Sequence, residues 1–116
     1  MRARARVREE EKMEIIEKDV EGYLRNQVRQ KLGGLALKFI SPGQSGVPDR
    51  IVLLPGARIV FVETKAPKKT PRALQKWVAS VLRQFGFDVR CIDTKAKVRE
   101  FIREFQEVKS DAVHTP

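Results

Sequence analysis

The chain has 116 residues, and 24 Lys and Arg against 15 Asp and Glu give it a net charge of +9. This length predicts a single domain with a hydrophobic core of its own. The one cysteine, Cys91, excludes an intramolecular disulfide, and no apolar run approaches the roughly 18 residues of a membrane span. Because the apolar stretch of a signal peptide is also missing, we expect a cytoplasmic protein without membrane association.

The positive charge is concentrated in two segments that together account for the whole excess. Residues 1–8 contain four arginines, residues 65–76 contain five lysines and arginines, and neither segment contains an acid. Such a local excess is typical of a protein that binds a polyanion, with nucleic acid the favoured partner. A solubilising arm and a solvated helix start would give the same pattern.

Apolar residues recur every four positions in the first third of the chain. Val20, Leu24 and Val28 predict an amphipathic helix within residues 9–32. Gly33 and Gly34 should end it, since glycine accepts the left-handed conformation at a helix C-terminus. A short strand over residues 35–40 and a loop over residues 41–46 follow.

Two strands rich in Val, Ile and Leu are predicted over residues 50–54 and 58–64, joined by a turn at residues 55–57. Thr70 and Pro71 then predict an N-cap and the first turn of a second helix, which should end at Gly86. We expect the large aromatic residues Trp77 and Tyr23 to pack against the protein, and the alternative is that they are platforms on which bases stack.

A half-buried strand with Cys91 inward and a last amphipathic helix capped by Thr94 complete the pattern. The prediction is therefore an α/β fold of order αβββαβα, with one mixed sheet flanked by helices. We expect a basic arm over residues 1–8, one domain over residues 9–109 and a flexible tail over residues 110–116.

Two acidic residues lie level with each other on the predicted hairpin. If the turn uses only residues 55–57, Asp49 lies directly across from Glu63, and Lys65 shares the face of Glu63 because side chains alternate along a strand. Adjacent carboxylates repel each other unless a cation intervenes, and Mg²⁺ suits such oxygen ligands. A neighbouring lysine could position an attacking water or stabilise charge on phosphorus.

The alternative is that Asp49 caps a loop while Glu63 and Lys65 solvate a strand end. A shift of one residue in register would move Asp49 to the opposite face, so the metal site depends on the hairpin pairing.

Longer motifs contain these residues. The run GQSGVPDRI at residues 43–51 and the run FVETKAP at residues 61–67, together with Gly33-Gly34 and Gln75, resemble the VRR-NUC family of the PD-(D/E)xK nuclease superfamily. This resemblance implies a restriction-endonuclease-like core and a deoxyribonuclease that depends on Mg²⁺ or Mn²⁺. It further implies cleavage of branched DNA, most of all Holliday junctions, by a homodimer from a phage or a bacterium.

The resemblance also implies roles for single residues. Asp49 and Glu63 would be the metal carboxylates, with the backbone carbonyl of Thr64 as a further ligand, and Lys65 would be the catalytic lysine. Gln75 would lie beside the site. A glutamate of the first helix would contribute, and Glu21 fits the spacing better than Glu17, one turn earlier.

The predicted DNA contacts next to this site are the positive residues Lys68, Lys69, Arg72 and Lys76. Ser41 and Gly43 complete the set, because the backbone amides of their loop could approach a phosphate, although a permissive hairpin loop would have the same sequence. The alternative function is a non-catalytic basic nucleic-acid-binding module on the same scaffold. The acids separate the two hypotheses, because a simple binder has no need of carboxylates facing DNA.

Overall fold

The computed structural model describes residues 19–65 and 72–114, with side chains described as far as residue 107. Its helices and strands follow one another in the predicted order, so the α/β class is confirmed. No helix in these ranges is both long enough and apolar enough to cross a membrane. The basic arm predicted for residues 1–8 lies outside the described residues.

A helix over residues 19–32 opens the described part of the chain, and its last turn, η1 (Val28–Leu32), is π-helical. It ends at Gly33, whose φ of 65° is the left-handed conformation that glycine permits. The side chains at the predicted four-residue spacing are buried. They are Val20, Leu24, Val28 and Leu32.

The strands of the single mixed sheet are β1 (Leu35–Lys38), β2 (Arg50–Leu54), β3 (Arg58–Thr64) and β4 (Asp88–Ile92). They lie in the order β1-β2-β3-β4. The first two pairings are antiparallel and the third is parallel. Strands β2 and β3 have the predicted bounds, whereas β1 ends at Lys38 instead of Ile40.

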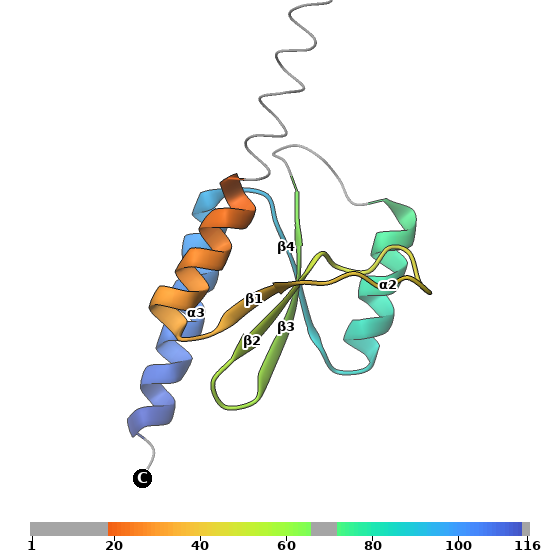
Figure 1. Cartoon of the computed structure of the whole chain (residues 1–116). Coiled ribbons are helices and arrows are strands. Elements are labelled where there is room, and N and C mark those ends of the chain that lie inside the picture. Colours follow the sequence, from red (N-terminus) through yellow and green to blue (C-terminus); the bar gives the residue numbers. More distant parts are fainter. Residues whose placement is uncertain (1–18, 66–71, 115–116) are drawn as a thin grey trace, which may run out of the picture.

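Helices cover both faces of this sheet (Figure 1). The helix over residues 19–32 and α3 (Lys95–His114) lie side by side on one face, and α2 (Ala73–Gln84) lies on the other. The core fills the space between the helix pair and the sheet. Alternate residues of β3, among them Val60 and Val62, point into that core, and the residues between them point towards the α2 side.

Helix α2 differs from its prediction at both its start and its face. Its N-cap is Arg72 instead of Thr70, a residue outside the described ranges, and the N–H of Arg72 donates to Oε1 of Gln75 at 2.8 Å. Val78 is its buried residue, whereas Trp77 is 58 % exposed. Trp77 thus packs less than predicted, whereas Tyr23 packs against the core as predicted.

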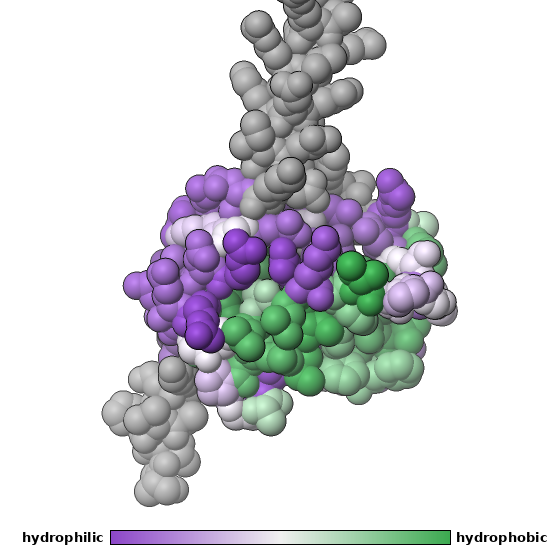
Figure 2. All heavy atoms as spheres, viewed as in Figure 1, coloured by the Kyte–Doolittle hydropathy of each residue, from purple (hydrophilic) through white to green (hydrophobic). Residues whose placement is uncertain are grey.

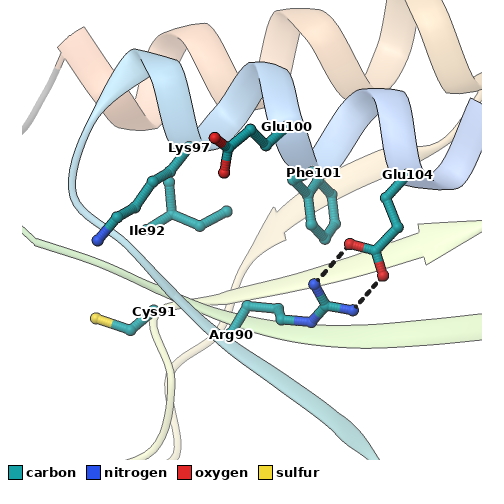
Figure 3. Close-up of a pocket in the computed structure, with 7 residues that line it drawn as sticks. All are labelled: Arg90, Cys91, Ile92, Lys97, Glu100, Phe101 and Glu104. Carbon is teal, nitrogen blue, oxygen red and sulfur yellow. Dashed lines mark hydrogen bonds and ion pairs between the residues drawn. The ribbon is translucent and has the colours of Figure 1, made fainter.

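Arg90 ties β4 to α3. Its guanidinium forms two hydrogen bonds with the Glu104 carboxylate, at 2.8 and 2.9 Å, and also binds Asp88. The same group lies over the rings of Phe101 and Phe105. Figure 3 shows Arg90 with Glu104 and Phe101. This pairing raises the pKa of Arg90, through Glu104 first and Asp88 second.

The last strand and helix depart from prediction in two details. Cys91 is exposed instead of buried, because it lies on the α2 side of an edge strand that the helix covers only in part. Helix α3 begins after Thr94, whose Oγ1 accepts the N–H of Lys97 as predicted. It continues to His114, past the start of the tail predicted for residues 110–116.

Candidate active site

The β2–β3 hairpin has the register that the predicted site requires. Arg50 pairs with Val62 and Leu54 pairs with Arg58, so the turn comprises three residues. The recorded ladder ends at Arg50 and Val62, one step before Asp49 and Glu63. The three-residue turn is confirmed, whereas the expectation that Asp49 and Glu63 share one face is not met, because the Asp49 side chain binds Thr64.

The carboxylate of Asp49 lies at the end of this ladder and binds Thr64. Its Oδ1 accepts the N–H of Thr64 at 2.9 Å, and its Oδ2 lies 2.5 Å from the Thr64 hydroxyl. The reason is that Asp49 sits in a bend just before β2, where strand alternation no longer fixes its direction. Asp49 thus joins the group around Thr64 instead of standing over the outward face of Glu63.

Glu21 comes to the same place from the first helix. Its Oε1 lies 3.1 Å from the Thr64 hydroxyl and 3.8 Å from Nε of Arg50. Glu21 is therefore the first-helix glutamate that reaches the site, as its spacing predicts. Glu17 lies outside the described residues.

The two carboxyl groups perturb each other. Burial raises the pKa of Asp49 to about 7, with hydrogen bonding to Glu21 and the charge of Glu63 acting in the same direction. Burial alone would raise the pKa of Glu21 as well, but the hydrogen bond with Asp49 and the charge of Arg50 bring it below its ordinary value. A pair of acids in this state can share one proton in the absence of a cation.

A second cluster lies on the other side of β3. Oε1 of Glu63 accepts a hydrogen bond from Nε2 of Gln75 at 3.3 Å, and the ammonium of Lys65 lies 3.4 Å from the same oxygen. The Gln75 side chain also caps the start of α2, so one residue links the helix to the carboxylate. The prediction that Gln75 lies beside Glu63 is correct in position.

Two partners in the site are absent from the sequence prediction. The first is the Thr64 hydroxyl. The second is Arg50, whose side chain is 11 % exposed and whose buried Nε has no hydrogen bond within the described part of the chain. The sequence pattern could have indicated Thr64, because it is a polar residue at an inward position of β3 and its inward neighbours Val60 and Val62 are apolar.

The donor set fits a hard divalent cation in chemistry. Oxygen ligands lie on both sides of the end of β3, because the carboxyl groups of Glu21 and Asp49 meet at the Thr64 hydroxyl whereas Glu63 lies on the other side of the strand. A cation would offset the burial and the neighbouring charge that raise the pKa of Asp49. Among the described residues no group of three or more acidic, His or Cys side chains is already gathered around one point. Water or phosphate oxygens would have to complete such a shell, as is usual for Mg²⁺.

The predicted DNA contacts are placed in part. Lys68 and Lys69 lie outside the described residues. Arg72 and Lys76 are exposed at the start of α2. The loop that contains Ser41 and Gly43 turns towards the same helix (Figure 1).

A cavity of about 120 Å³ is lined by residues of β3, β4, α2 and the loop before β2. Glu63 and Gln75 line it at the site, and Lys76 and Arg83 line it along α2. Lys76, one of the predicted contacts, and Arg83, which was not predicted, thus line the same cavity as Glu63.

A mixed sheet with paired acids and a lysine at the end of its third strand defines this protein as a nuclease-type α/β domain. No family model matches the chain. A solved structure described as a VRR_NUC domain is similar to it, with a TM-score of 0.71 and 31 % identity over 76 % of this chain and 95 % of that one. "Putative nuclease p44" of Acyrthosiphon pisum secondary endosymbiont phage 1 is 44 % identical over 84 residues, which are 72 % of this chain and 89 % of the relative. The chain belongs to the VRR-NUC family of nucleases, as its motifs predict.

Proposed function

We propose that this nuclease is a divalent-metal-dependent endodeoxyribonuclease that hydrolyses phosphodiester bonds in branched DNA, with the four-way junction as its main substrate. The observation that carries the proposal is the acid pair at Thr64, next to Glu63 and Lys65. Partly buried carboxylates in a protein with a net charge of +9 have an evident role if a cation joins them to a phosphate.

Asp49, Glu63 and the Thr64 carbonyl would hold Mg²⁺ or Mn²⁺, with Glu21 adjacent. When bound, the ion would lower the pKa of a water molecule and neutralise charge on the phosphate. Lys65 would orient the attacking water or stabilise the charge that develops on the phosphate oxygens. Gln75 would keep the Glu63 carboxylate in place through its amide.

DNA would approach along the start of α2. Arg72 and Lys76 are exposed there, and Lys68 and Lys69 precede them in the chain. Contacts with phosphate would position the duplex, without reading its sequence. Ser41 and Gly43, in the loop beside the helix, would lie within the same footprint.

Junction resolution needs two cuts on opposed strands, and a twofold homodimer would supply two sites in the required relation. An exposed apolar surface on the sheet, at Leu35, Leu53 and Ile59, supports this assembly. The phage relative supports a role in the cytoplasm of an infected bacterium.

The test is cleavage of a labelled four-way junction with Mg²⁺ or Mn²⁺, beside linear duplex and flap controls. Wild-type protein should cut the junction, EDTA should abolish cleavage, and Asp49→Asn should lose at least about 100-fold of the rate, because it removes a metal carboxylate. Full activity in EDTA or in the variant would overturn the proposal. Binding without cleavage would return the function to a non-catalytic nucleic-acid binder.

A further inference from the structure

Thr64 is the one polar residue among the buried side chains of the described core, with 1 % of its surface exposed. It occupies an inward position of β3, in line with Val60 and Val62. Valine has nearly the same shape and would fill this place without the cost of burying a hydroxyl. The hydroxyl therefore needs partners that compensate for its desolvation.

Those partners are two carboxyl groups from separate elements. The Thr64 hydroxyl lies 2.5 Å from Oδ2 of Asp49, just before β2, and 3.1 Å from Oε1 of Glu21, on the first helix. The N–H of Thr64 holds the other oxygen of Asp49 at 2.9 Å. One residue thus contacts both acids, and its own neighbours in sequence are Glu63 and Lys65.

A hydroxyl suits this position because it donates a hydrogen bond to one carboxylate and can accept one from the other carboxyl group when that group is protonated. Threonine is also branched at Cβ, which limits the rotation of its side chain and fixes where the oxygen lies. Serine would keep the oxygen but rotate more freely. Valine would keep the shape and lose the bridge.

We propose that the Thr64 side chain is a positioning residue, which holds Glu21 and Asp49 in the arrangement that receives the metal ion. This inference rests on the proposed function and adds a side-chain role to a residue that would otherwise contribute only its carbonyl. Groups that orient metal ligands typically affect metal affinity by about 10–100-fold. The Thr64 hydroxyl stands in that relation to both carboxylates.

The experiment is titration of Mn²⁺ into metal-free protein, followed by calorimetry, for wild type, Thr64→Val and Thr64→Ser. We expect Thr64→Val to bind Mn²⁺ at least about tenfold more weakly and Thr64→Ser to recover affinity to within about threefold of wild type. Val52→Ala is the matched control, since it removes buried methyl groups from β2 at a position that pairs with Val60, four residues before Thr64 on β3. It should lower the melting temperature and leave the Mn²⁺ affinity unchanged.

A second measurement separates positioning from general damage to the fold. In a Glu21→Gln background the same Thr64→Val change should cost clearly less Mn²⁺ affinity, because one of the two carboxylates that it positions is gone. If Thr64→Val does not fold, as judged by circular dichroism, Thr64→Ala takes its place in both titrations.

The outcomes are distinct. Equal Mn²⁺ affinity in wild type and Thr64→Val overturns the inference and leaves the proposed nuclease function standing. An equal loss of affinity in Thr64→Ser and Thr64→Val also overturns it, since the hydroxyl would then be irrelevant. Failure of the wild type to bind Mn²⁺ at all overturns the proposed function itself, and the inference with it.

Discussion

Asp49 is the residue at which burial and charge oppose each other most directly. Its pKa is raised to about 7, so its ionisation in the folded protein costs free energy that it does not cost in the unfolded chain. The stability that the protonated form provides is complete below the ordinary value of 3.8 and is lost as the pH rises through about 7. The lowered pKa of Glu21 acts in the opposite sense, but only below about 4.5.

We therefore predict that Asp49→Asn stabilises the metal-free protein in a pH-dependent way. Its melting temperature should exceed that of wild type by several degrees more at pH 8 than at pH 5, because asparagine cannot ionise. Thermal unfolding in EDTA, followed by circular dichroism, measures this difference. Mg²⁺ should raise the wild-type value at pH 8, since a bound cation favours the ionised acid. The same difference at both pH values would show that Asp49 does not titrate in this range.

At this scale the sequence predicts the acids better than their partners. Asp49 and Glu63 follow from counting residues outward from a three-residue turn, which is a local property of the hairpin. The hydrogen bond between Thr64 and Glu21 joins β3 to a helix 43 positions earlier in the chain, and no local pattern specifies that contact. A local sequence pattern also does not specify which side of each strand is exposed, because this depends on where the helices pack.

At the scale of elements, the loop before β2 is held against α2 by a close approach at Gly46. This glycine has a φ of +84°, and a Cβ there would lie 2.8 Å from Cγ of Leu74 and 3.1 Å from its backbone. Both the conformation and the space exclude a larger residue. The loop that leads into Asp49 is thus fixed to the helix that carries Gln75.

We predict that Gly46→Ala destabilises the protein by about 1–3 kcal/mol, from strain at positive φ and from displacement of α2. Chemical denaturation measures the change. Gly43→Ala is the matched control in the same loop, because a Cβ at Gly43 meets nothing within 4 Å. Equal stability of the two variants would contradict the close contact between loop and helix.

The sequence predicts well the bounds of elements that end at turn residues. It predicts less well which side chains are buried, because burial depends on how the helices cover the sheet. Strands β2 and β3 have the predicted bounds because a Pro-Gly turn and flanking breaks mark their ends. The inward position predicted for Cys91 was wrong and Trp77 packs less than predicted, since both lie on the α2 side, where one helix covers a wider sheet. No sequence pattern considered above predicts the π-helical turn of η1.

At the scale of the whole molecule, this uneven coverage leaves an apolar surface on the sheet. Leu35 of β1 pairs with Leu53 of β2, which pairs in turn with Ile59 of β3, and the three side chains are 43 %, 37 % and 41 % exposed. Figure 2 shows a broad hydrophobic area on this side of the molecule. Exposed apolar rows of this kind mark surfaces that associate with other proteins.

A second copy of the chain is the occupant that the proposed function requires. Both the acid site and the basic start of α2 lie at the other end of β3 from Ile59, so pairing through the apolar row would leave them free to meet DNA. The excess positive charge of the sequence belongs to residues 1–8 and 65–76, and none of these residues is part of the row.

We predict that the wild-type protein sediments as a dimer at micromolar concentration and that Leu53→Glu shifts it to monomer. A carboxylate in the middle of the row would be buried without a partner in the dimer, whereas in the monomer it would face water. The fold should survive, because Leu53 is already partly exposed, and circular dichroism checks this. Gln106→Glu, which adds the same charge on α3 across the molecule, should remain dimeric. A monomeric wild-type protein would contradict the dimer, and a dimeric Leu53→Glu variant would place the interface elsewhere. If the variant is monomeric as expected, it should still cut one strand of a junction but lose the paired cleavage of both strands.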